Sequence, residues 1–122
     1  MTIQEYLVKL DARLQELSGI ILTSSIQREI DANLGIGFIK GRLVFLDGST
    51  LDFSEQLPVE RTKFRLHYMD AENNLILRWD SAPHYRHLKI FPFHLHTPQV
   101  VEEHPAMTLL EALDRIEAMI EF

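Results

Sequence analysis

The chain has 122 residues, of which 46% are hydrophobic and 25% are charged, and its formal net charge at pH 7 is −6. This length fits one domain spanning residues 1–122, and the composition is typical of a globular protein, which favours a folded chain over a disordered one. The absence of cysteine excludes disulfides and thiolate zinc sites. Because no apolar run approaches the roughly 20 residues that cross a bilayer, and the N-terminus has no signal-peptide core, we expect a cytoplasmic protein without membrane association.

The first predicted element is a helix over Ile3–Leu17. Its apolar side chains recur at helical spacing and predict one buried stripe, which consists of Ile3, Leu7, Leu10, Leu14 and Leu17. Thr2 and Glu5 fit a capping box at its start, and Gly19 is typical of a helix end.

Five strand-like runs follow this helix. They span Ile20–Ile30, Ile36–Leu46, Thr50–Gln56, Thr62–Asp70 and Leu75–Asp80. Asp47 and Gly48 are a strong hairpin signal, and the residues from Asp70 to Asn74 tolerate turn geometry. Short turns between successive strands predict an antiparallel meander.

Side-chain alternation in the last two runs predicts a polar face. If these runs pair, four polar side chains share that face. They are Arg65, His67, Arg78 and Asp80. Arg78 and Asp80 could form only a local ion pair there, because polar faces of antiparallel sheets are normally solvated. Lys40 and Arg42 share another strand face and are assigned to solvent.

The segment Ser81–His104 is predicted to be a long loop. It contains three prolines, Pro83, Pro92 and Pro98, which argue against continuous regular structure. A loop of this length in a compact domain is typical of a functional segment.

A last helix is predicted over Leu109–Ile120, with Thr108 and Glu111 as its capping box. Its buried stripe consists of Leu109, Ala112, Leu113, Ile116 and Ile120. The predicted fold is therefore α+β, with an antiparallel five-strand meander packed on one face by the N- and C-terminal helices.

Positive charge gathers in one part of this acidic chain. Residues 61–96 contain six Lys/Arg and three Asp/Glu, whereas the rest of the chain contains six Lys/Arg and fifteen Asp/Glu. Five of the six histidines also lie in residues 61–96. Such an asymmetry can focus an anionic ligand on one face, or it can simply solvate one side of a sheet.

Four histidines fall close together in the predicted loop: His84, His87, His94 and His96. Imidazole suits proton transfer near neutral pH and is also a common metal ligand. One interpretation is metal-independent cleavage of a phosphodiester, in which two histidines act as base and acid. The charge on phosphorus would be neutralised by Arg78 with Arg86 or Lys89, and Tyr85 could stack on a base or donate to phosphate.

Two other interpretations stay open. In the second, the four histidines form a divalent metal site that Asp80 or Glu103 completes, although no standard motif such as H-E-x-x-H is present. In the third, the histidines only order the loop, and the protein is a non-enzymatic binding module.

The second half of the chain contains the succession HYMDAENNLILRWDSAPHYRHLKIFPFHLH, which is followed by a short acidic stretch and a T-x-x-E helix. In this succession the chain resembles the TumE family of toxin components from prokaryotic toxin–antitoxin pairs. The resemblance covers most of the chain, including the opening T-x-x-E-Y-L helix and the G-R-L-x-F-x-D-G-S hairpin. The residues that match the family pattern are Arg78, Asp80, His84, Pro92, His94 and His96. Ser81, Tyr85 and Phe93 stand where the pattern has Asn, His and His.

The resemblance implies a growth-inhibiting toxin that is encoded beside an antitoxin and acts on RNA by analogy with other small toxins. It favours Arg78, His84, His94 and His96 as catalytic residues. The residues expected to bind substrate are Arg65, His67, Tyr85, Arg86, His87 and Lys89. We expect no metal or other cofactor, and the expected partners are a cognate antitoxin, an RNA substrate and a second copy of the chain.

Overall fold

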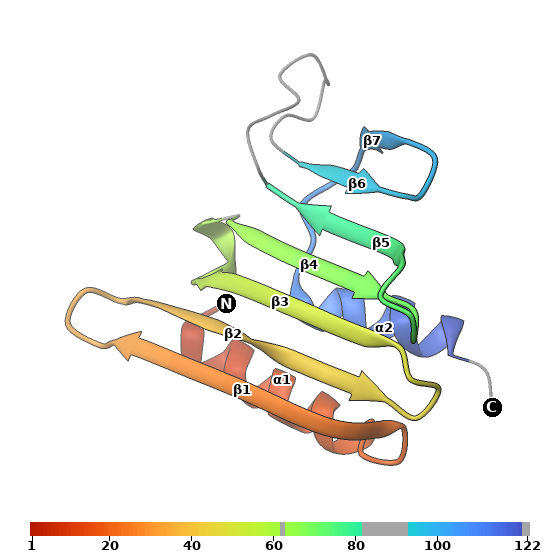
Figure 1. The fold of residues 1–122 in the computed structure, drawn as a ribbon. Helices are drawn as coiled ribbons and strands as arrows, with labels where there is room; N and C mark the ends of the chain where they lie inside the picture. The colour runs from red at the N-terminus through yellow and green to blue at the C-terminus, as the bar shows by residue number, and fades with distance from the viewer. Residues whose placement is uncertain (62, 82–92, 121–122) are drawn as a thin grey trace.

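The computed structural model describes residues 1–61, 63–81 and 93–120, and the rest of the chain lies outside the described residues. The described residues form a seven-stranded sheet with the order β1-β2-β3-β4-β5-β6-β7, in which every neighbouring pair is antiparallel. The sheet is therefore a simple meander (Figure 1). The predicted α+β class and the predicted antiparallel meander are confirmed.

The element bounds lie close to those predicted. The helices are α1 (Ile3–Glu16), the 3-10 helix η1 (Val59–Arg61) and α2 (Leu109–Met119). The strands are β1 (Ile21–Asp31), β2 (Ile36–Phe45), β3 (Thr50–Leu57), β4 (Phe64–Met69), β5 (Leu75–Asp80), β6 (His94–His96) and β7 (Val101–Glu103). Among the described helices, none is both long and apolar enough to cross a membrane.

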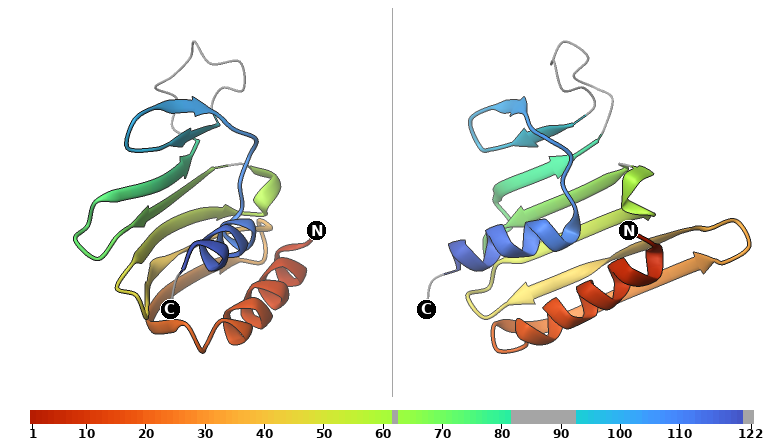
Figure 2. Two further views of the ribbon diagram at one scale, coloured as in Figure 1. Left: turned by 90° about the vertical axis from the view of Figure 1, so that its right-hand side faces the viewer. Right: turned by 180° about the vertical axis from the view of Figure 1, so that it is seen from behind.

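Both α-helices cover one face of the sheet, as the two views of Figure 2 show. Leu10 and Leu17 from the first predicted stripe, and Leu109 and Ile116 from the second, are buried in a core shared with the sheet. The helices begin where the sequence predicts. The hydroxyl of Thr2 accepts a hydrogen bond from the N–H of Glu5, and a complete capping box is present at the start of α2.

One buried polar contact joins both helices to the sheet. The hydroxyl of Tyr6 in α1 donates to Oε1 of Glu55 in β3 at 2.6 Å, and the N–H of Leu109 in α2 donates to Oε2 at 2.9 Å. Burial raises the pKa of the Glu55 carboxyl, although these two hydrogen bonds act in the opposite direction. The carboxylate thus satisfies a donor at the N-terminus of α2, where the helix dipole also favours negative charge.

The predicted number of five strands is wrong, because the segment Ser81–His104 is not one continuous loop. β6 and β7 lie inside it, and β6 pairs with β5. Each of these two strands has only three residues. A run this short cannot be recognised by its alternation, and its hydrogen bonds to a neighbouring strand are what make it a strand.

Candidate functional site

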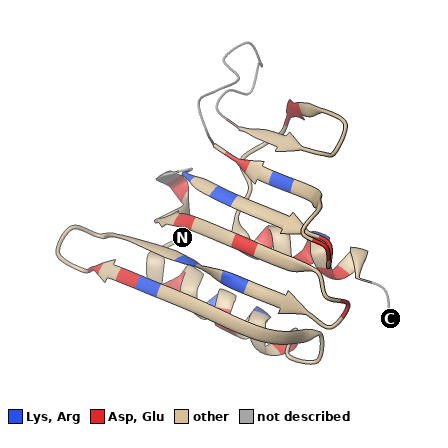
Figure 3. Ribbon diagram, viewed as in Figure 1, with Lys and Arg blue, Asp and Glu red and all other residues tan. Residues whose placement is uncertain are grey.

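The register of the sheet aligns polar residues from different strands in two rows. The first row consists of Arg42, Asp52, His67, Arg78 and His96. The second row consists of Lys40, Ser54, Arg65, Asp80 and His94. Their chain neighbours Leu43, Leu66 and Trp79 belong to the core under the helices, so these rows lie on the opposite face of the sheet. Figure 3 shows Lys and Arg positions on β2, β4 and β5, and acidic positions on β3, which lies between β2 and β4.

At one end of these rows four side chains form a cluster, which we call the histidine cluster: Arg78, Asp80, His94 and His96. Nδ1 of His94 lies 2.6 Å from Oδ1 of Asp80 and 3.0 Å from Nε2 of His96. Nε2 of His96 also lies 3.3 Å from Oδ2 of Asp80. Nε of Arg78 lies 3.2 Å from the same Oδ2, so the predicted ion pair between Arg78 and Asp80 is present.

Arg78 determines which ring nitrogen of His96 carries the proton. Nη2 of Arg78 lies 3.1 Å from Nδ1 of His96, and a guanidinium group can only donate. Nδ1 must therefore accept, and the proton of the neutral imidazole is on Nε2. That N–H faces Asp80 and His94, so the carboxylate of Asp80 is placed to stabilise the ring if it becomes charged.

The cluster is largely withdrawn from solvent. His94 is 1% exposed, and His96 and Asp80 are each 5% exposed. Burial is the main reason that the pKa of His96 lies below the usual 6.5; the Asp80 carboxylate opposes this shift and the Arg78 guanidinium adds to it. At neutral pH His96 is therefore uncharged and able to accept a proton.

A pocket of about 630 Å³ opens beside the cluster. Its lining includes His96 and Asp80 together with three cationic side chains, Lys63, Arg65 and Arg78. Asp80 and Glu55 also line this pocket, whose surface is more apolar than polar, and its three converging cations suit an anionic ligand. His96 is thus the histidine of the cluster that meets this pocket.

Asp80, His94 and His96 could also be considered as metal ligands, because one ligand atom from each lies within 4.8 Å of the others. Neighbouring ligands in a tetrahedral zinc site are about 3.3 Å apart, so the separations within the cluster fit an ion. The proton on Nε2 of His96 does not fit a metal site, because that nitrogen would have to be the metal ligand. A ligating histidine normally donates its other N–H to an acceptor, whereas Nδ1 of His96 faces the donor Arg78.

The structure brings together three of the four predicted catalytic residues, Arg78, His94 and His96. Arg65 and His67 lie on the same sheet face, directly opposite Asp80 and Arg78 in the register. The other predicted site residues lie outside the described residues; they are His84, Tyr85, Arg86, His87 and Lys89.

Two features of the site were missed in the sequence. Asp80 was considered only as an ion-pair partner or a metal ligand, although it contacts both histidines of the cluster. Lys63, which lines the pocket, was predicted to share a strand face with Arg65 but was not assigned to the site. The alternation of Lys63 and Arg65 on one strand face was the available signal for this lysine.

A protein-family model described as "Toxin TumE" matches residues 10–121, which include every described residue of the cluster and pocket. Comparisons with curated proteins and with solved structures found no match.

Proposed function

The chain belongs to the TumE toxin family, and from this premise we propose that it is the growth-inhibiting component of a toxin–antitoxin pair and acts by cleaving RNA without a metal ion. The contact between Arg78 and Nδ1 of His96 carries this proposal, because it keeps an uncharged imidazole in one tautomer beside a cationic pocket. Family membership supports the toxin role, and the chemistry of the pocket supports a phosphodiester substrate.

The proposed mechanism is general base catalysis by His96. When a phosphodiester enters the pocket, the guanidinium of Arg78 turns to a phosphate oxygen, and Nδ1 of His96 takes the proton of the attacking 2′-hydroxyl. The 2′-oxygen bonds to phosphorus, the bond to the 5′-oxygen breaks, and the 5′-oxygen takes up a proton from water, whose hydroxide is neutralised by the proton that His96 then releases. Asp80 faces Nε2–H and stabilises the imidazolium that forms, while Arg65 and Lys63 add positive charge.

His94 has a different role in this mechanism. Its side chain is buried against Asp80 and His96, so we propose that it positions these two groups instead of touching the substrate. The catalytic role of His84 stays a prediction.

A second candidate function is metal-dependent hydrolysis. The observation that favours it is the convergence of ligand atoms from Asp80, His94 and His96. In that case the ion would displace the proton from Nε2 of His96 and would itself neutralise charge on the substrate, so the loss of Arg78 would matter less. The two functions therefore make opposite predictions for Arg78 and for chelators.

The test is induced expression of single-substitution variants, with growth and cleavage of total RNA as readouts. His96→Ala is expected to reduce the cleavage rate by about 10²–10⁴-fold and Arg78→Ala by about 10²–10³-fold, while a chelator changes nothing. Arg115→Ala, which removes an exposed arginine of α2 on the helix-covered face, is the matched control and should remain fully toxic.

Two outcomes would contradict the proposal. The metal-dependent function holds if three results occur together: a chelator abolishes activity, the His variants lose bound metal, and Arg78→Ala is the mildest of the substitutions. If none of the substitutions relieves growth inhibition, or the chain never inhibits growth, the chain is a binding module whose histidines have an ordering role.

We further propose a cognate antitoxin as the partner of the chain, which follows from the toxin role. Co-expression with the product of the neighbouring gene should restore growth. The homodimer predicted from the sequence stays a prediction.

A further inference from the structure

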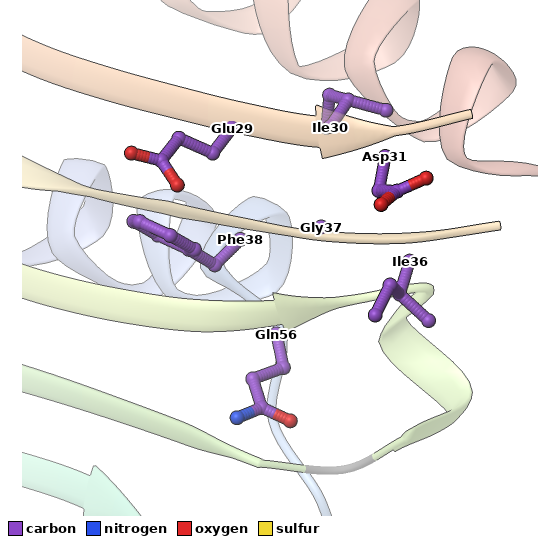
Figure 4. A pocket seen from close by; sticks show the side chains of 7 residues that line it. All are labelled: Glu29, Ile30, Asp31, Ile36, Gly37, Phe38 and Gln56. Atoms are coloured by element: carbon purple, nitrogen blue, oxygen red, sulfur yellow. The ribbon is translucent and has the colours of Figure 1, made fainter. Parts of the chain in front are cut away.

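Phe38 occupies an unusual place for an aromatic side chain. Among the described residues it is the aromatic side chain that neither belongs to the core nor packs against it. It projects from β2 on the open face of the sheet, between Glu29 of β1 and Gln56 of β3 in the register (Figure 4). Phe38 also lines the pocket that contains His96, Arg78 and Asp80, so one pocket holds an aromatic ring together with three members of the histidine cluster.

One cation lies over this ring, and two others line the pocket that the ring shares with His96, while the acidic Glu29 is the register partner of Phe38. Nζ of Lys40 lies 5.9 Å from the ring centroid of Phe38. Lys40, Lys63 and Arg65 form no ion pair with any carboxylate of the described segments. Arg65 lines both the pocket of His96 and a second pocket of about 480 Å³ that also contains Lys40. The two pockets share Ser54 and Arg65, and we call the cations Lys40, Arg65 and Lys63 that line them the cationic track.

We infer that this track binds single-stranded RNA, with one base stacked on Phe38 and the neighbouring phosphates held by Lys40, Arg65 and Lys63. The inference rests on the proposed RNA cleavage and adds the form of the substrate. Phe38 is half-buried, and a base can lay its π face on the accessible part of this ring only when the base is unpaired, whereas the cations are attracted to phosphate in any nucleic acid. The ring therefore selects single strands, and the cations supply affinity.

The test measures binding in the His96→Gln background, so that cleavage does not consume the probe. A labelled oligouridine strand should bind more tightly than the same strand annealed to its complement. Phe38→Leu keeps an apolar side chain but removes the ring, and it should weaken single-strand binding by at least about fivefold. Phe38→Trp should retain binding.

The cations are tested by the salt dependence of binding. Lys40→Gln and Arg65→Gln should each reduce the slope of log affinity against log salt by about 0.7, because each removes one phosphate contact with a single strand. Lys9→Gln, an exposed lysine on α1 at the helix-covered face, is the matched control and should leave affinity and slope unchanged.

Equal affinity for single and double strands, or unchanged binding by Phe38→Leu, would overturn the inference. So would an effect of Lys9→Gln as large as that of Lys40→Gln. The proposed function is contradicted by a different result, namely toxicity and RNA cleavage that are unchanged when His96 is replaced. If strands bind through Phe38 but are never cleaved, the track stands and the ribonuclease proposal falls.

Discussion

At the scale of single residues, the contact between Arg78 and His96 explains how an acidic protein can present an uncharged histidine next to several cations. Arg78 is 29% exposed in its side chain, so it can reach the pocket while it still donates to Nδ1 of His96. Burial alone would also lower the pKa of His96, but it would not determine the tautomer.

A pH measurement tests this contact. Because the charge of Arg78 helps to lower the pKa of His96, Arg78→Ala should raise that pKa, although burial should still hold it below 6.5. A general base works above its pKa, so the acid limb of any residual activity should move to higher pH. NMR titration of the His96 ring checks the pKa directly. A pKa that falls in Arg78→Ala would contradict the role assigned to this contact.

At the scale of secondary-structure elements, Glu55 holds three of them in place. Glu55→Ala leaves the N–H of Leu109 and the hydroxyl of Tyr6 without their acceptor, and each lost bond at a buried group costs about 1–3 kcal/mol. The free energy of unfolding, measured with urea, should therefore fall by about 2–5 kcal/mol. Glu29→Ala, at an exposed position of β1, should change it little. Equal stability of the two variants would show that the Glu55 contact does not fix the helices.

The pairing of β1 with β2 depends on a close approach at Gly41. A Cβ atom at Gly41 would lie 2.1 Å from the carbonyl oxygen of Ser25 and 3.0 Å from Cα of Ile26, so the backbone would have to move. We expect Gly41→Ala to destabilise the protein by about 1–3 kcal/mol, or more if β1 detaches. Gly19→Ala is the control, because a Cβ there meets nothing within 4 Å. The thermal unfolding temperatures of both variants test this prediction. A Gly41→Ala protein as stable as Gly19→Ala would contradict it.

At the scale of the whole molecule, the sheet separates two surfaces of different composition. One face is covered by both helices and encloses the core, while the other carries the two polar rows and the pocket. The net charge of −6 does not describe this second face, where Lys40, Lys63 and Arg65 lack acidic partners among the described residues.

This separation predicts a steep salt dependence despite the acidic total charge. Affinity for RNA should fall as salt rises, because phosphate contacts on the open face release counterions. Reversing a charge on the helix-covered side, as in Arg115→Glu, should have little effect on that slope. Affinity that stays constant from low to physiological salt would point to a protein ligand for this face.

The sequence by itself determined the family, both α-helices and five of the strands. The helical stripes and the alternation in long strands extend over enough residues to be recognised, and the motif around Arg78 and His96 identified a TumE-like toxin. It also predicted that Arg78 and Asp80 share a strand face, since that follows from a period of two residues.

The sequence predicted Arg78, His94 and His96 as site residues, but only the tertiary structure decided how these side chains meet. β6 has three residues, and its position depends on hydrogen bonds to β5, which are contacts between segments distant in sequence. That pairing places His96 opposite Arg78 and His94 opposite Asp80, and it thereby determines the tautomer of His96 and its access to the pocket. The place of Phe38 beside the same pocket was likewise decided by the register of β2 with β3, because a strand pattern specifies which face a side chain takes but not which strands lie next to it.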